Sequence, residues 1–169
     1  MTHAATTRTL ILLRHAKSAY PDGVADHERP LAPRGIREAA LAGKWIRAKL
    51  PAVDCVLCST ATRTRQTLAR TDIAAPVQFV DRLYDATAGI AIDVINRSGG
   101  EAGTLLVVGH EPVMSSLALG LAGPDSSQAA ANQIEVKYPT SAIAVLQTER
   151  PWSQLELRSA TLRTFHVPR

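Results

Sequence analysis

The chain has 169 residues, of which 46% are hydrophobic and 20% charged, and its formal net charge is +4. This size suits one domain over residues 1–169, with 1–8 as a flexible lead-in. No apolar run approaches the ~20 residues that cross a bilayer, and MTHAATTRT lacks a signal-peptide core, so we expect a cytoplasmic protein without membrane contact. The scattered basic residues and 4% aromatic content argue against nucleic-acid binding.

Short apolar runs alternate with stretches of helical spacing along the chain. We predict strands at 9–13, 53–57, 77–80 and 104–109. We predict helices at about 34–50, 62–71 and 90–97, and a fourth that begins at Pro112. Two further strands, within 141–147 and 153–160, would close the sheet as an antiparallel pair. This pattern predicts an α/β fold, a three-layer α/β/α sandwich with a mostly parallel central sheet and one antiparallel edge strand.

Two features need separate interpretation. Trp45 falls on the polar side of the first predicted helix, where burial of one helix face does not explain it. Cys55 and Cys58 form a CxxC within a strand-like run, where residues three apart point to opposite faces. A shared metal or a disulfide would require the strand to break, so we expect structural thiols.

Polar side chains follow three of the predicted strands. Arg14 and His15 follow the first, Ser59 and then Arg63 the second, and His110 the fourth. Since ligands of open α/β sheets bind beyond the carboxyl ends of the strands, we expect these residues to meet at one edge. Either histidine alone is more typical of a capping or core residue. Together with the arginines, they predict a pocket for a phosphoryl group, which a histidine can attack.

Several segments of the sequence resemble the histidine phosphatase superfamily (branch 1, phosphoglycerate mutase-like). They are LLRHAKS at 12–18, STATRTRQT at 59–67 and VVGHEP at 107–112, joined by DHERPLAPRG at 26–35. The last segment and the short length resemble the SixA-like phosphohistidine phosphatases in particular. The similarity spans residues 9 to about 146. It departs from the family pattern at Ala16, where glycine is usual, and at Thr60, where proline is usual.

The resemblance implies roles for the residues at the ends of the strands. His15 would be the nucleophile that carries the phosphoryl group. Arg14, Arg63 and His110 would bind that group and stabilise the transition state. No cofactor is implied, and we expect no metal because the arginines already supply the positive charge that a metal would bring.

The resemblance also implies roles for Ser18, Arg29 and Asp85. Ser18 and Arg29 would be secondary substrate-binding contacts in the pocket. Larger relatives use a glutamate to protonate the leaving oxygen, and Asp85 occupies the matching offset after the third predicted strand. Asp85 is therefore our candidate acid, with a turn or capping residue as the alternative.

The predicted function is a metal-independent phosphatase that hydrolyses phosphohistidine on signalling or carrier proteins, through a covalent phosphohistidine on His15. Phosphohistidine expels an imidazole, which leaves more readily than an alkoxide and tolerates a weak proton donor. Two alternatives stay open: a broad phosphomonoesterase or mutase-like enzyme acting on small phosphate esters, and a non-catalytic phosphate-binding module.

Overall fold

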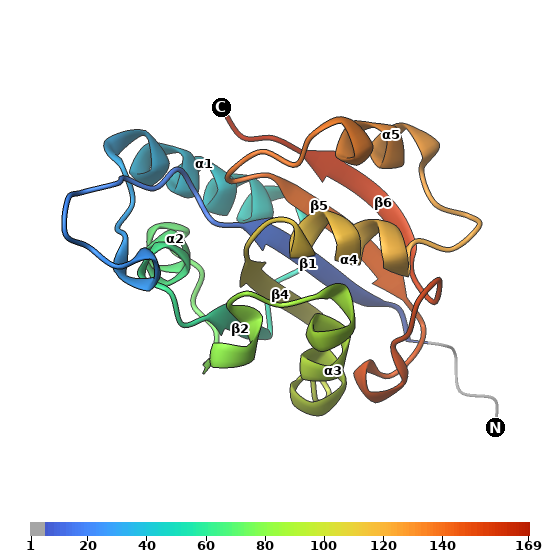
Figure 1. Cartoon of the computed structure of the whole chain (residues 1–169). Coiled ribbons are helices and arrows are strands. Elements are labelled where there is room, and N and C mark those ends of the chain that lie inside the picture. The colour runs from blue at the N-terminus through green and yellow to red at the C-terminus, as the bar shows by residue number, and fades with distance from the viewer. Residues whose placement is uncertain (1–5) are drawn as a thin grey trace, which may run out of the picture.

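The computed structural model describes residues 6–169 (Figure 1). Its elements in chain order are β1 (Arg8–Arg14), η1 (Asp26–Glu28), α1 (Pro33–Lys49), β2 (Cys55–Ser59), α2 (Thr62–Arg70), β3 (Val77–Val80), η2 (Asp81–Leu83), α3 (Ala88–Ser98), β4 (Thr104–Gly109), α4 (Val113–Leu121), α5 (Gln128–Val136), β5 (Ile143–Thr148), η3 (Trp152–Gln154) and β6 (Thr161–His166). Arg8, the last residue of the expected lead-in, already belongs to β1, and residues 1–5 lie outside the described range. Among the described helices, none has the length and apolar character needed to cross a membrane.

The strands form one six-stranded sheet in the order β3-β2-β4-β1-β5-β6. Neighbours among β3, β2, β4 and β1 are parallel, whereas β5 runs antiparallel to both β1 and β6. The mostly parallel sheet with an antiparallel pair at one side confirms the predicted fold class. The two central strands, β1 and β4, are buried on both faces, which explains their nearly continuous apolar sequences.

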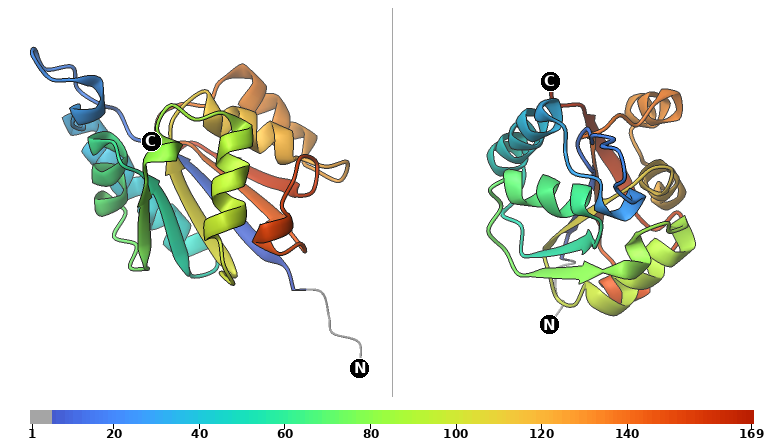
Figure 2. Two further views of the ribbon diagram at one scale, coloured as in Figure 1. Left: turned by 60° about the horizontal axis from the view of Figure 1, so that its bottom comes forward. Right: turned by 60° about the vertical axis from the view of Figure 1, so that its left-hand side comes forward.

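Alternating side chains of the sheet divide the interior into two apolar layers. In β1, Leu10 and Leu12 pack on the side of α3, α4 and α5, whereas Ile11 and Leu13 pack on the side of α1 and α2. Figures 1 and 2 show these helices on opposite faces of the sheet. Cys55 contacts the first layer and Cys58 belongs to the second, so the two free thiols lie on different faces, as the strand period predicts.

The contacts of helix α1 explain the tryptophan on its polar side. The Trp45 indole stacks on the imidazole of His166 at the end of β6, with ring centroids 4.5 Å apart and planes 7° apart.

Helix α1 approaches the end of α2 closely at Gly43. A methyl group at Gly43 would lie 2.1 Å from the backbone oxygen of Thr71.

The second predicted strand of the antiparallel pair, 153–160, is wrong. That stretch contains η3 and a turn, and the strand begins only at Thr161. Trp152 is fully buried and its indole donates a hydrogen bond to the Ala102 carbonyl, which holds the chain against α3 before it can extend. Arg158 then adopts a left-handed conformation, with φ of 62°. Helix α5 was not predicted from the sequence.

The close contact between α1 and the end of α2 at Gly43 should contribute to the stability of the fold. Gly43→Ala should lower the free energy of unfolding by ~1–3 kcal/mol, because its methyl group meets backbone that cannot rotate away. Gly89→Ala is the matched control in α3, where the nearest atom would be 3.9 Å away, and it should stabilise by up to ~1 kcal/mol. Urea unfolding followed by circular dichroism measures both changes. Equal values for the two variants would contradict the assigned helix contact.

Candidate active site

The backbone register of β1 and β4 brings two histidines together. Arg14 is paired with Gly109 across these parallel strands, so His15 and His110 each follow a paired residue at the same edge of the sheet. The His15 N–H donates to the Gly109 carbonyl at 2.9 Å. The two imidazole centroids are 5.3 Å apart. The sequence prediction that the strand ends converge is therefore met by the geometry.

The His15 ring is held in one tautomer. Its Nδ1 lies 2.7 Å from the Ala16 carbonyl oxygen, which can only accept, so Nδ1 carries the proton and Nε2 keeps a free electron pair. The side chain is almost buried, at 7% exposure. Burial lowers the pKa of His15 to about 3, with smaller contributions from His110, Arg14 and Arg63. The imidazole is thus neutral and nucleophilic across the physiological pH range.

His110 is oriented by a neighbouring strand. Its Nε2 lies 2.8 Å from the Ser59 hydroxyl at the end of β2, whereas its Nδ1 is buried without a partner among the described residues. Burial is also the main cause that lowers the pKa of His110, to about 4, and the charge of Arg63 acts in the same direction. A phosphoryl dianion beside this ring would favour its protonated form, which could then donate to the anion.

Two arginines supply the positive charge. Arg14 donates from Nη1 to the Tyr138 carbonyl at 2.8 Å, and burial lowers the pKa of its guanidinium. Arg63, in the first turn of α2, is only 6% exposed. It donates to Asp26 twice, from Nη1 to the carbonyl at 2.7 Å and from Nη2 to the carboxylate at 3.1 Å. The Nε atoms of both arginines are buried without partners among residues 6–169.

Ser18 and Arg29, the two further residues predicted for the pocket, lie beside the histidines and arginines. Arg29 donates from Nη1 to the Ser18 hydroxyl at 2.8 Å and from Nε to Asp26 at 3.1 Å. Together these side chains enclose a pocket of about 230 Å³ at the carboxyl ends of the central strands. Its lining comprises Arg14, His15, Lys17, Ser18, Tyr20, Arg29, Arg63, His110, Glu111 and Thr140. Six of the seven residues predicted for the site thus line one pocket.

Asp85, the seventh predicted residue, is not among those that line the pocket. It is exposed and adopts a left-handed conformation with φ of 58°. The residue before it, Tyr84, turns toward the site instead. The Tyr84 ring lies edge-on to His110, with centroids 5.5 Å apart, and its hydroxyl donates to the Asp26 carboxylate.

Asp26 is a site residue that the sequence reasoning missed. Its carboxylate accepts hydrogen bonds from Tyr84, Arg29 and Arg63, and these partners, Tyr84 first, keep the pKa of Asp26 well below its usual range. Asp26 therefore stays ionised and fixes two cations of the pocket. The available signal was its spacing of three residues from Arg29 in the DHER segment.

Glu111 was also missed, although it belongs to the VVGHEP segment. Its two carboxylate oxygens accept from the backbone N–H of Ser115 at 2.7 Å and from the Ser115 hydroxyl at 2.8 Å. The carboxylate thus caps the first turn of α4. Both carboxylates near the pocket, Asp26 and Glu111, act as acceptors of protein hydrogen bonds.

The two departures from the family motifs fit into this structure. Ala16 is fully buried against Leu31 and Ala39, and its N–H donates to the Thr67 hydroxyl at 2.9 Å. Thr60 donates from its hydroxyl to Asp81 at 2.7 Å and contacts Nε2 of His27 at 3.0 Å. The threonine therefore connects two loops beside the site and leaves the pocket open.

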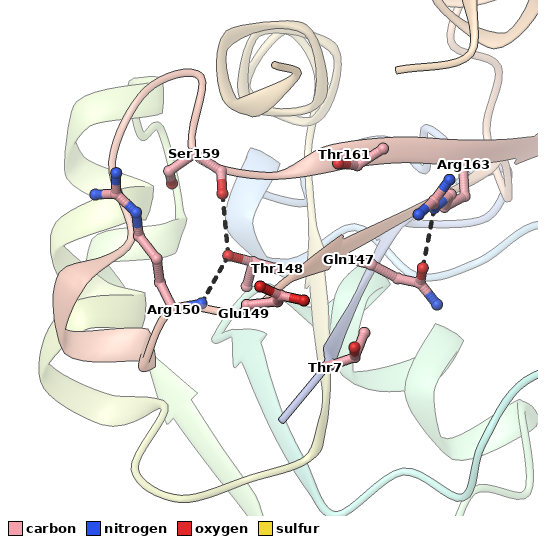
Figure 3. A pocket seen from close by; sticks show the side chains of 8 residues that line it. All are labelled: Thr7, Gln147, Thr148, Glu149, Arg150, Ser159, Thr161 and Arg163. Atoms are coloured by element: carbon pink, nitrogen blue, oxygen red, sulfur yellow. Dashed lines mark hydrogen bonds between the residues drawn. The ribbon is translucent and has the colours of Figure 1, made fainter. Parts of the chain in front are cut away.

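A second pocket lies at the opposite end of the sheet, beside the start of β1 (Figure 3). It has a volume of about 330 Å³. Its polar groups pair with one another: the Thr148 hydroxyl donates to the Ser159 carbonyl and accepts from the Arg150 N–H, and Arg163 donates to Gln147. It contains no histidine or cysteine, so we assign no chemistry to it. Within residues 6–169, no group of three or more metal-ligating side chains could hold a metal ion.

The fold and the pocket define an α/β protein with two histidines and three arginines in one pocket at the carboxyl ends of the central strands, and comparisons place it in a family. Residues 10–92 match the family model of the histidine phosphatase superfamily (branch 1). The uncharacterized protein Rv1276c of Mycobacterium tuberculosis is 61% identical over 158 residues, covering 93% of this chain and all of that protein. The uncharacterized protein ML1117 of Mycobacterium leprae is 51% identical over 161 residues, with coverage of 93% and 100%.

Solved structures agree with this assignment. A protein of Nakamurella multipartitia, provisionally named phosphohistidine phosphatase SixA, superposes with a TM-score of 0.88 and 39% identity over 96% of both chains. A protein of Agrobacterium tumefaciens with the same provisional name gives 0.76 and 27%, over 95% of this chain and 99% of its own. The chain belongs to the histidine phosphatase superfamily (branch 1) and is SixA-like, and these similarities support phosphatase activity.

The burial of His15 makes a prediction about its titration. An ordinary imidazole with a pKa of about 6.5 changes from mostly neutral to mostly charged between pH 8 and pH 5. With its pKa lowered to about 3, His15 should remain neutral over this range, with the proton on Nδ1. Two-dimensional ¹⁵N–¹H NMR of the imidazole rings measures both properties, and His15→Ala assigns the signals. A midpoint near 6.5, or a proton on Nε2, would contradict the neutral Nδ1–H form derived for His15.

Proposed function

We propose that this protein is a metal-independent phosphatase that hydrolyses phosphohistidine on proteins, through a covalent phosphohistidine on His15. One observation supports the substrate class more than any other. The carboxylates beside the pocket, Asp26 and Glu111, are engaged as acceptors of hydrogen bonds from neighbouring groups, so neither is placed to protonate a leaving group. An alkoxide needs such a proton, whereas the imidazole of phosphohistidine departs with much less help.

The first step transfers the phosphoryl group to the enzyme. The Nε2 electron pair of His15 attacks phosphorus in line, and the bond from phosphorus to the substrate nitrogen breaks. The imidazole leaves with that electron pair and regains its proton from water. Arg14 and Arg63 neutralise the phosphoryl oxygens during transfer, and His110 donates a hydrogen bond to them once the anion has raised its pKa.

The second step restores the nucleophile. Water attacks the phosphorus of phosphorylated His15, the P–N bond breaks, and orthophosphate leaves while Nε2 recovers its electron pair. The hydrogen bond from Nδ1 of His15 to the Ala16 carbonyl holds the ring in place through both steps. The roles of Ser18 and Arg29 are to complete the walls of the pocket and to orient the bound group.

Phosphate release from a phosphohistidine-bearing carrier domain, without added metal, tests this function. His15→Ala should reduce the rate by about 10³-fold or more, the scale expected for loss of a nucleophile. His166→Gln is the matched control, because His166 stacks on Trp45 outside the site. Alkali-stable phosphate should be found on the wild type and be absent from His15→Ala.

Other outcomes of this assay would select another function. Turnover of small esters alone would indicate a broad phosphomonoesterase or mutase-like enzyme, and Asp85 is then our proposed proton donor. In that case Asp85→Asn should reduce alkyl phosphate hydrolysis by ~10²–10⁴. Binding of the phosphorylated domain without any turnover would indicate a phosphate-binding module.

A further inference from the structure

Tyr20 is an aromatic residue at the mouth of the pocket. It lies in the connection between β1 and α1, which projects from the body of the molecule (Figure 2), and it shares the pocket lining with His15 and Arg29. Its residue surface is 73% exposed. An aromatic side chain left this open gains little from burial, and its ring stays accessible to a molecule bound in the pocket.

Comparison with the other exposed apolar residues isolates Tyr20. The described residues include six large hydrophobic side chains that are exposed: Tyr20, Val24, Leu41, Phe79, Val136 and Leu157. Of these six, Tyr20 alone lines the pocket that contains His15. Phe79 has the same kind of neighbour, since the guanidinium carbon of Arg65 lies 4.2 Å from its ring centroid, but it is outside the pocket.

The Tyr20 ring rests on a fixed cation. The guanidinium carbon of Arg29 lies 4.0 Å from its ring centroid. Hydrogen bonds to Asp26, to the Ser18 hydroxyl and to the Ala19 carbonyl hold that guanidinium in place. The arginine supports the ring by a cation–π contact, and Nζ of Lys17 lies farther away, 5.9 Å from the centroid, while the residue stays largely exposed at the pocket mouth.

We propose that Tyr20 stacks on the imidazole ring of the substrate phosphohistidine and so selects a phosphoryl group carried on a planar ring. This inference rests on the proposed function. The pocket of about 230 Å³ is lined mainly by cations, imidazoles and hydroxyls, with the single carboxylate of Glu111, and this excess of positive charge suits the phosphoryl group itself. The substrate ring, one P–N bond away from phosphorus, then lies at the mouth of the pocket, where an aromatic face is available. Stacked aromatic pairs add affinity beyond the area they bury.

The test compares two P–N substrates that differ in the ring. One is a phosphohistidine peptide, and the other is phosphoramidate, which has the same bond to phosphorus and no ring. Tyr20→Ala should reduce kcat/KM for the peptide by about three- to tenfold, as expected for loss of one aromatic contact, and leave phosphoramidate within about twofold. The loss should appear mainly in KM, because the stack forms in the bound substrate.

Two further variants separate the stack from other causes. Tyr20→Phe keeps the ring and should keep the wild-type preference for the peptide, whereas Tyr20→Leu keeps apolar bulk and should lose it. Phe79→Ala removes the other arginine-supported aromatic and should change neither substrate. Thermal unfolding of each variant reports whether the fold is intact.

The outcomes distinguish this inference from the proposed function. Equal losses for both substrates in Tyr20→Ala, or no loss for either, would overturn the stacking role while leaving the phosphohistidine phosphatase in place. Full activity of Tyr20→Leu on the peptide would also overturn it. Failure of the wild type to release phosphate from the phosphohistidine peptide would instead overturn the proposed function, and the inference with it.

Discussion

The hydrogen-bonded register between β1 and β4 is the constraint on which the site depends. It aligns Arg14 with Gly109, so the residues that follow, His15 and His110, emerge side by side from buried strands. A slip of one residue would exchange the two faces of β1 and bury the wrong side chains in both apolar layers. The packing of α1 to α5 therefore opposes a one-residue slip, which would also separate the two histidines.

Charge balance shapes the pocket. Arg14, Arg29 and Arg63 are crowded together, and their mutual repulsion would be costly in a partly dry site. Asp26 offsets part of that cost by accepting from two of them while leaving the Nε of Arg63 without a partner. The two histidines avoid adding to the repulsion because burial keeps them neutral. The pocket is thus prepared for an anion without being unstable in its absence.

The sequence was sufficient for the parts of the molecule that are governed by periodicity. Strands buried on both faces and the long helix α1 have strong hydrophobic patterns. Because His15 and His110 follow two of these strands, they could be predicted to meet at the carboxyl edge of the parallel sheet. Asp26, Tyr84 and the outward turn at Asp85 lie in connections, where the path depends on tertiary contacts that have no period. The start of β6 was predicted too early, because residues 152–154 form η3, with the Trp152 indole buried and bonded to the Ala102 carbonyl. This is an effect of tertiary packing and not of local sequence preference.

Backbone hydrogen bonds hold His15, whereas side-chain contacts hold the residues at the mouth of the pocket. This difference affects how the protein can change during evolution. His15 is held by the backbone carbonyls of Gly109 and Ala16, which do not depend on the chemistry of a side chain. The rim at Tyr20, Ser18 and Arg29 is held by side chains of a loop that projects from the body. Mutation can therefore redesign what is recognised at the rim while the reacting atom stays in place. Divergence among relatives of this fold should accumulate in that loop.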